Sequence, residues 1–228
     1  MKTTDKAIFI HRSPYSSNSL ITTFYTEKNG LQRFVFKGGK KKSHALFPLA
    51  ISEISYYGRN SELLNLTDAT LINPLSFQFN PIKSTIAYFA VEVLQKCVQQ
   101  GDPDLNLFNL MVNEVDKLED ASNLHLFPVE LMIQFAYRLG IYPLVDEEDM
   151  GYFNLDTGSY QHTDSQSQRC LSGEAVAFLK QLLLEESIEI PNKTIREEAL
   201  TILLNYFSIH IPNFKNLKSY SILKEVLD

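Results

Sequence analysis

The feature that most constrains the fold of this chain is a change in the spacing of its apolar residues near residue 80. Up to Ile72, apolar and polar residues alternate in short runs, as in strands with one buried face. Beyond Pro81 they recur every three or four residues, as in amphipathic helices. Asn73-Pro74 and Asn80-Pro81 separate the two patterns. The sequence therefore predicts an α+β chain, with a barrel module over residues 1–78 and a helical module over residues 81–228.

Five short strands are predicted in the first module. Asn29-Gly30 predicts a type I′ hairpin turn, because both central residues of that turn need a positive φ. Five strands in a module of this size fit a small OB-type barrel, and on pattern alone an SH3-like barrel fits nearly as well. The predicted strands are Ala7–His11, Leu20–Thr26, Leu31–Lys37, Leu49–Tyr57 and Leu63–Ile72.

Helix signals continue through the second module. Gly101 is expected to end the first helix, and Asp102 with Pro103 to begin the second as N-cap and first helical residue. Asn123 is expected to cap a third helix. Residues 141–171 break the helical pattern and predict a small irregular subdomain containing a hairpin. Further helices are expected from Ser172, over Asn192–His210, and within Phe214–Leu227.

Charge is distributed unevenly along the 228 residues, although the net charge is −6. The first 80 residues carry ten Lys or Arg against five Asp or Glu, whereas the remainder carries 11 against 22. A basic module joined to an acidic one suggests that the first binds a polyanion and the second contacts proteins.

The basic charge gathers around the third predicted strand. Arg33 to Lys37 alternates as a strand, Gly38-Gly39 follows, and then come Lys40, Lys41 and Lys42. A glycine turn carrying three lysines is suited to contact phosphates. The alternative interpretation is an ordinary solvated lysine loop.

Aromatic residues lie among these basic ones, and single-strand binding by a small barrel needs both. Strand alternation puts about half of the aromatics in the core, which leaves Tyr15 and Tyr57 as candidates for base stacking. No signature of base-edge recognition is present, so we expect sequence-tolerant, salt-dependent binding. The candidate DNA-binding residues are Arg12, Tyr15, Arg33, Lys37, Lys40, Lys41, Lys42 and Tyr57.

Catalytic and metal sites are weakly indicated. No Walker, G-x-S-x-G or H-E-x-x-H motif occurs. Asp146 to Asp149 could hold a divalent cation, but a solvated acidic loop is the simpler interpretation. His162 and Cys170 supply only two of the four ligands that a structural zinc needs. We therefore expect no enzyme and no cofactor. Two distant cysteines and no membrane-length apolar run predict a cytoplasmic protein without a membrane partner. If it binds DNA, we expect it to be nucleoid-associated.

Fragments in a fixed order along nearly the whole chain resemble the RecO family of bacterial recombination mediators. Each fragment is weak alone, but the ordered set is fairly specific. The fragments are Ala7–Ile10, Tyr15–Ile21, Phe24–Gly30, Phe36–Ser43, Phe47–Leu49, Tyr57–Gly58, Arg138–Pro143, Phe153–Gly158, Tyr206–Ile211, Leu217–Ser219 and Ile222–Lys224.

The resemblance implies a DNA-repair function for an OB barrel followed by a helical domain. It implies binding of single- and double-stranded DNA, annealing of complementary strands, and help in loading RecA onto strands coated by single-strand-binding protein. The implied partners are RecR, possibly RecF, and the acidic C-terminal tail of single-strand-binding protein. The resemblance implies that the loop from Lys37 to Lys42 contacts DNA. Many relatives have a four-cysteine zinc site in the stretch matching 151–170, and this sequence lacks those cysteines.

A pocket for that tail would need a basic group beside an apolar cleft in the helical domain. Arg138, Lys215 and Lys218 are the candidates. Two other functions stay open from the residues themselves. One is an RNA-binding barrel with a helical partner domain, and the other is a metal-dependent nuclease that uses Asp146 to Asp149.

Overall fold

The computed structural model describes residues 2–40, 46–58, 63–72, 75–145, 151–163, 168–186 and 189–227. The contacts of the chain divide it into two compact units, Met1–Ala121 and Ser122–Asp228. Within the described residues, no helix is both long enough and apolar enough to span a membrane.

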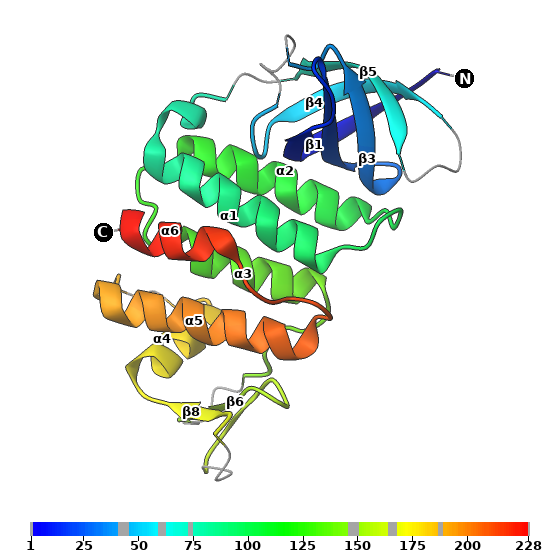
Figure 1. Cartoon of the computed structure of the whole chain (residues 1–228). Helices are drawn as coiled ribbons and strands as arrows, with labels where there is room; N and C mark the ends of the chain where they lie inside the picture. The colour runs from blue at the N-terminus through cyan, green and yellow to red at the C-terminus, as the bar shows by residue number, and fades with distance from the viewer. Residues whose placement is uncertain are drawn as a thin grey trace. The chain divides into compact units, whose positions relative to one another are not determined.

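The first unit begins with a closed five-stranded barrel (Figure 1). Neighbouring strands follow the order β1-β2-β3-β5-β4, and β4 pairs back onto β1. Among the described strands of the barrel, only the β3–β5 pair is parallel. This Greek-key closure is that of an OB barrel, so the predicted fold class is confirmed. The strands are β1 Lys2–Pro14, β2 Ser19–Thr26, β3 Gly30–Lys37, β4 Ile51–Tyr57 and β5 Leu64–Leu71.

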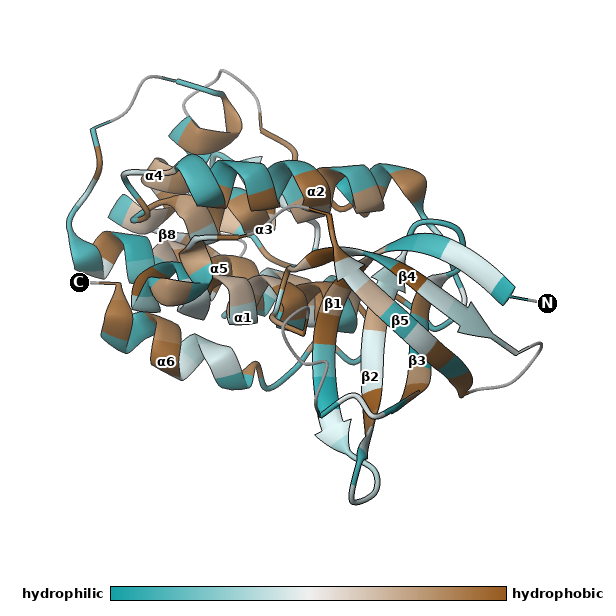
Figure 2. Ribbon diagram, turned by 90° about the horizontal axis from the view of Figure 1, so that it is seen from above, coloured by the Kyte–Doolittle hydropathy of each residue, from teal (hydrophilic) through white to brown (hydrophobic). Residues whose placement is uncertain are grey.

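Aromatic rings fill the barrel because alternate strand residues point inward. Phe24 contacts Phe9 and Phe34 edge-on, with ring centroids 5.3 and 5.8 Å apart, respectively. Phe34 in turn contacts Tyr56 at 5.1 Å. The alternation can be followed in Figure 2 as successive hydrophobic and hydrophilic bands along β5. Most barrel aromatics are therefore core residues.

The turn between β2 and β3 lies where it was predicted, but its type differs. Thr26 pairs with Gly30, so three residues form the loop. Gly30 has a φ of +63°, whereas Asn29 is not in the positive-φ region. A three-residue loop closed by a left-handed glycine is a common alternative to the two-residue turn. The type I′ prediction is wrong because only one of the two residues has the required conformation.

Among its described residues, the first unit also contains the short 3-10 helix Phe77–Phe79 and two α-helices, α1 (Pro81–Cys97) and α2 (Leu105–Asp120). Asn80 caps α1 by accepting from the backbone N–H groups of Ile82 and Lys83. Asp104 caps α2. The predicted caps at Gly101 and Asp102 are wrong, because the residues before α2 pair with the barrel: Gly101 N donates to Leu31 O at 3.1 Å.

The N-terminal end of α2 packs on the outside of the barrel. The rings of Tyr25 and Phe108 lie 6.2 Å apart, and the Tyr25 hydroxyl donates to Asp104 O. Burial raises the pKa of Tyr25 to about 12. Gly30 has no room for a side chain, since an added Cβ would overlap the backbone of Asp102. The compact unit thus extends beyond the predicted module 1–78, whose boundary stays a prediction.

The second unit contains four helices and a three-stranded sheet among its described residues. The sheet has the order β7-β6-β8, and the β6–β7 pair is the predicted hairpin. The predicted cap at Asn123 is wrong: its side chain accepts from His125 N, and the helix begins at Phe127. The elements are α3 Phe127–Arg138, β6 Tyr152–Asn154, β7 Ser159–Gln161, β8 Cys170–Ser172, α4 Glu174–Leu183, α5 Lys193–His210 and α6 Lys218–Val226.

Aromatic packing joins the small sheet to α5. The Phe153 ring lies 5.0 Å from that of Tyr160 and 5.6 Å from that of Tyr206. A ring nitrogen of His210 lies 2.8 Å from Leu155 O. In the part of the chain that the structure describes, no three His, Cys, Asp or Glu side chains are grouped as a metal site would require. The expectation of no zinc stays a prediction.

Candidate nucleic-acid interface

Three strands form an uncovered basic surface on the barrel, which we call the open face. β2 and β3 pair in register, so Thr23 lies beside Arg33 and Ser19 beside Lys37. β1 adds His11, which pairs with Thr23. Paired residues point to the same side of a sheet. The open face consists of His11, Ser13, Ser19, Ile21, Thr23, Arg33, Val35 and Lys37.

The open face is the free half of a longer surface. Farther along the same strands, the outward row made by Ile8, Tyr25 and Leu31 lies under α2 and the residues before it. Arg33 and Lys37 lie beyond this cover and are exposed. The helical packing therefore covers one half of this longer surface and leaves the half nearest the glycine turn accessible to a ligand.

Two glycines set the turn that follows β3. Gly38 has a φ of +72°, which a glycine adopts without strain. Gly39 N donates to Phe36 O, and an added Cβ on Gly39 would lie 2.8 Å from the Phe36 ring. Lys40 follows and is exposed. Lys41 and Lys42 lie outside the described residues.

The remaining predicted residues divide between this end of the barrel and other surfaces. Tyr15 is 59% exposed, and its N–H donates to the carbonyl oxygen of Ser19, the residue that pairs with Lys37. Arg12 pairs with buried Thr22 and so lies on the opposite side of β1 from His11. The structure brings Tyr15, Arg33, Lys37 and Lys40 to one end of the barrel, and Arg12 is not part of the open face.

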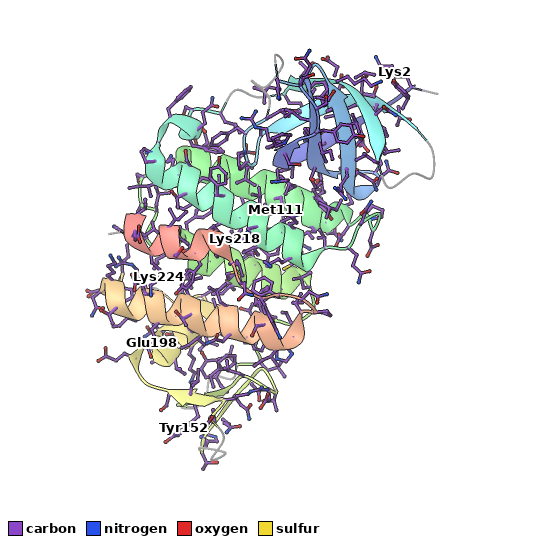
Figure 3. All side chains as sticks on the ribbon, in the orientation of Figure 1. Lys2, Met111, Tyr152, Glu198, Lys218 and Lys224 are labelled. Atoms are coloured by element: carbon purple, nitrogen blue, oxygen red, sulfur yellow. The ribbon has the colours of Figure 1, made fainter. Side chains whose placement is uncertain are left out.

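Tyr57 lies on β4 and is 45% exposed. It pairs with Asn65 on β5 and with Lys2 at the start of β1, which Figure 3 labels. Since β5 separates β4 from β3, Tyr57 is about 10 Å from the β3 row by strand spacing alone. The register nevertheless places Tyr57 in one lateral row with Asn65 and Val35, so Tyr57 lies across β5 from the open face and on the same side of the sheet.

The outward surface of β4 and β5 has the opposite charge. Glu53 on β4 and Asp68 on β5 are both exposed there. A phosphate backbone would be repelled from these carboxylates and attracted to Arg33 and Lys37. The barrel is thus electrostatically polarised, with its basic side on β3.

His11 lies on the open face, and the sequence analysis assigned it no role. Partial burial and the nearby Arg33 charge lower the pKa of His11, so the ring is neutral at pH 7. A strictly alternating β1 would place Arg12 on the open face instead. The register shift between Phe9 and His11 exchanges the two residues, and the sequence carried no clear signal for this bulge.

The predicted partner residues of the second unit do not all line one groove. Lys215 lines a groove between α5 and α6 with a volume of about 350 Å³. Arg138 lies at the end of α3 with its guanidinium 5.7 Å from the Tyr137 ring and does not line that groove. Lys218 begins α6. The groove is lined by Thr201, Leu204, Asn205, Ser208, Phe214, Lys215, Asn216, Leu217 and Tyr220.

A second hollow combines basic and apolar side chains that were not predicted. It lies between α3, α5 and α6, and we call it the α3–α5–α6 hollow. Glu197 lies inside it, 3.3 Å from Lys224 Nζ and 3.9 Å from Lys193 Nζ; Figure 3 labels Lys224 on α6. The i, i+3 spacing of Lys193 and Arg196 was the available sequence signal. The lining is His125, Pro128, Val129, Lys193, Arg196, Glu197, Leu200, Tyr220, Leu223, Lys224 and Leu227.

Comparison with known proteins covers nearly the whole chain. A family model described as "Recombination protein O N terminal" matches residues 1–75, and one described as "Recombination protein O C terminal" matches residues 78–220. The chain belongs to the RecO family.

Curated RecO proteins match over almost their full length. The chain is 30% identical to "DNA repair protein RecO" of Flavobacterium johnsoniae, with 99% of each chain covered. It is 29% identical to "DNA repair protein RecO" of Bacteroides fragilis, with 97% of each covered. The open face lies within the part matched by the N-terminal RecO model, and both hollows are formed mainly by the part matched by the C-terminal one.

Proposed function

We propose that the protein is a DNA-binding mediator of recombinational repair that acts without catalysing a reaction. The observation that carries this proposal is the open face, where an OB barrel in a RecO chain presents Arg33 and Lys37 beside a lysine-bearing turn. Phosphates are held by such groups irrespective of sequence. The relatives' name, DNA repair protein, supports the biological setting.

Annealing follows from charge neutralisation. Two complementary strands repel each other through their phosphates, and basic side chains that bind one strand lower that repulsion and release counterions. The carboxylates of Glu53 and Asp68, on the outward surface of β4 and β5, repel phosphates. A strand is therefore expected to bind on the β3 side and not around the whole barrel. We propose that this step is followed by RecA loading on strands coated by single-strand-binding protein, with RecR and possibly RecF as further partners.

We propose that the second unit binds the acidic tail of single-strand-binding protein. The α3–α5–α6 hollow offers this ligand more basic side chains than the α5–α6 groove, although its volume is only about 30 Å³ against about 350 Å³ and its two lysines pair with Glu197. It has three basic side chains, Lys193, Arg196 and Lys224, around an apolar floor, whereas the groove has only Lys215. An apolar terminal residue would enter the floor and its carboxylate would pair with the basic rim.

The decisive experiment measures annealing of complementary oligonucleotides coated with the cognate single-strand-binding protein, over a salt series. We expect acceleration that weakens steeply with salt and is lost when Lys40, Lys41 and Lys42 are all changed to Glu. The Lys28→Gln variant is the control, since Lys28 lies in the turn at the opposite end of β3. Unchanged annealing by the triple variant at low salt would refute the lysine-turn assignment, and no annealing by the wild-type protein would refute the function.

The tail site is tested separately with a labelled peptide copying the tail. Arg196→Glu is expected to reduce peptide affinity at least tenfold, while Lys215→Glu leaves it within about twofold. The reverse pattern would move the site to the α5–α6 groove. Loss of acceleration when the coat protein lacks its tail would link this site to annealing.

Two other functions are outcomes of the same experiments. Stronger binding to an RNA strand than to a DNA strand of equal length would favour an RNA-binding barrel. Cleavage of DNA with magnesium or manganese would favour a nuclease; the acids proposed for it, Asp146 to Asp149, lie outside the described residues. We expect neither outcome.

A further inference from the structure

We propose that the open face holds DNA through its phosphates and sugars and leaves the bases free to pair. This inference rests on the proposed function and specifies how the strand is bound. It separates this barrel from OB barrels that stack successive bases on aromatic side chains.

The aromatic residues of β1, β2 and β3, together with Tyr56 of β4, are not available for stacking, whereas Tyr57 of β4 is 45% exposed. Phe9, Phe24, Phe34, Phe36 and Tyr56 are each at most 5% exposed because they form the barrel core. Tyr25 points outward but is fully buried against Phe108 of α2. None of these rings can reach a bound base unless the fold opens.

The open face itself offers groups that suit a nucleic-acid backbone. Arg33 and Lys37 lie four residues apart on one side of β3, or about 13 Å apart along the strand. The hydroxyl group of Ser19 lies beside Lys37, whereas Thr23, which pairs with Arg33, is only 5% exposed. Guanidinium, ammonium and hydroxyl donors are the usual partners of phosphate oxygens. Two aliphatic side chains, Ile21 and Val35, separate the basic positions and can pack against sugars.

Rings occur only at the margins of this surface. His11 lies at its β1 edge, Tyr15 lies in the loop between β1 and β2, and Tyr57 lies on β4, across β5 from Val35. These three rings lie on separate parts of the barrel and could stack isolated bases, not a run of them. The described residues therefore favour a strand that lies along β3 with its bases turned away from the barrel.

This mode has a direct consequence for annealing. A base held on an aromatic ring must leave that ring before it can pair, whereas a base held only through its phosphate can pair at once. The same contacts also suit the annealed duplex, because phosphates remain accessible on it. A backbone-bound strand is thus a suitable substrate for pairing with a second strand.

The first test compares an ordinary 20-nucleotide strand with an abasic strand of the same length and charge, by fluorescence anisotropy. We expect dissociation constants within about threefold of each other. Stacking of even one base would cost the abasic strand about 5- to 150-fold, which corresponds to 1–3 kcal/mol per base. A loss in that range would overturn the inference, whereas failure of both strands to bind would overturn the proposed function instead.

The second test uses substitutions to separate phosphate contacts from base stacking. Arg33→Gln and Lys37→Gln should each weaken binding and reduce the slope of log affinity against log salt by about 0.7, as expected for one lost phosphate contact on a single strand. The His11→Ala, Tyr15→Ala double variant should bind within threefold of the wild-type protein. Lys28→Gln, which removes one charge at the other end of β3, controls for net charge. A double variant that loses tenfold or more would show base stacking.

The third test measures with a chemical probe whether the bases of a bound strand are exposed. Thymines of a bound strand should remain as reactive to permanganate as those of the free strand, because their faces are exposed. Protection of several consecutive thymines at saturating protein would refute backbone-only binding. Protection that disappears in the His11→Ala, Tyr15→Ala variant would identify those two rings as its cause.

Discussion

At the scale of single residues, Gly39 determines how the lysine turn leaves the barrel. Its backbone lies so close to Phe36 that a Cβ would be 2.8 Å from the ring and 3.0 Å from the carbonyl oxygen. Since Phe36 is a buried core residue, the ring has little freedom to move. The turn, and Lys40 with it, would have to shift.

We therefore expect Gly39→Ala to destabilise the first unit by about 1–3 kcal/mol, the usual cost of overpacking, and to weaken DNA binding. Thermal unfolding and strand-binding titrations measure the two effects. Gly151→Ala is the matched control, because nothing lies within 4 Å of its added Cβ and its φ is not positive. An unchanged melting temperature for Gly39→Ala would contradict the close contact.

Asp5 is a second residue with a defined consequence, because its carboxyl group is buried inside the barrel. Asn29 Nδ2 donates to Oδ2 at 3.2 Å, while Oδ1 has no hydrogen-bond partner among the described residues. Burial raises the pKa of Asp5 above its ordinary 3.8, and the Lys28 charge offsets only part of this. The folded state therefore keeps the proton to a higher pH than the unfolded state does.

The sign of the pH dependence follows from that difference. The contribution of Asp5 to the free energy of unfolding is greatest below pH 3.8. It falls as the pH rises through the raised pKa of Asp5 and stays lower above that pKa. Asp5→Asn should remove this fall and increase the free energy of unfolding at pH 7. Denaturant melts of both proteins from pH 4 to pH 8 measure it. A lower stability of the variant at pH 7 would mean that the ionised carboxylate is favourable.

At the scale of elements, the start of α2 is decided by a tertiary contact and not by the local capping signal. Both Asp102 and Asp104 could cap a helix, and Pro103 favours Asp102 by the usual rule. The pairing of residues 100 and 101 with Leu31 holds Asp102 in the connection to the barrel, so the helix begins two residues later. Asp104 Oδ1 accepts from Leu107 N at 3.0 Å.

Asp104→Ala is expected to cost about 1 kcal/mol of stability, the usual value for a lost N-cap. Asp102→Ala is the control and should have an effect below about 0.5 kcal/mol, typical of an exposed site. Urea unfolding of the intact chain gives both values. Equal losses in the two variants would show that the cap is shared between the two carboxylates.

At the scale of the whole molecule, the sequence predicted what depends on local periodicity. Alternation identified the five strands and put Arg33 and Lys37 on one side of β3, because side chains alternate regardless of the rest of the fold. The sides of β1 on which His11 and Arg12 lie could not be predicted, because a bulge near Ile10 reverses the alternation after it. The packing of Phe108 over Tyr25 could not be predicted from the sequence either, since the two residues are distant in the chain.

That cover leads to a prediction about fragments of the chain. A fragment of residues 1–121 keeps α2, so Tyr25 stays buried and its hydroxyl keeps the bond to Asp104 O. A fragment of residues 1–78 would expose the outward row of Ile8, Tyr25 and Leu31 to water, an apolar surface that costs about 25 cal/mol per Å². We expect the longer fragment to unfold cooperatively on heating and the shorter one to bind a hydrophobic dye and melt broadly. If both melted cooperatively at the same temperature, the barrel alone would be the folding unit and the predicted boundary after residue 78 would be right.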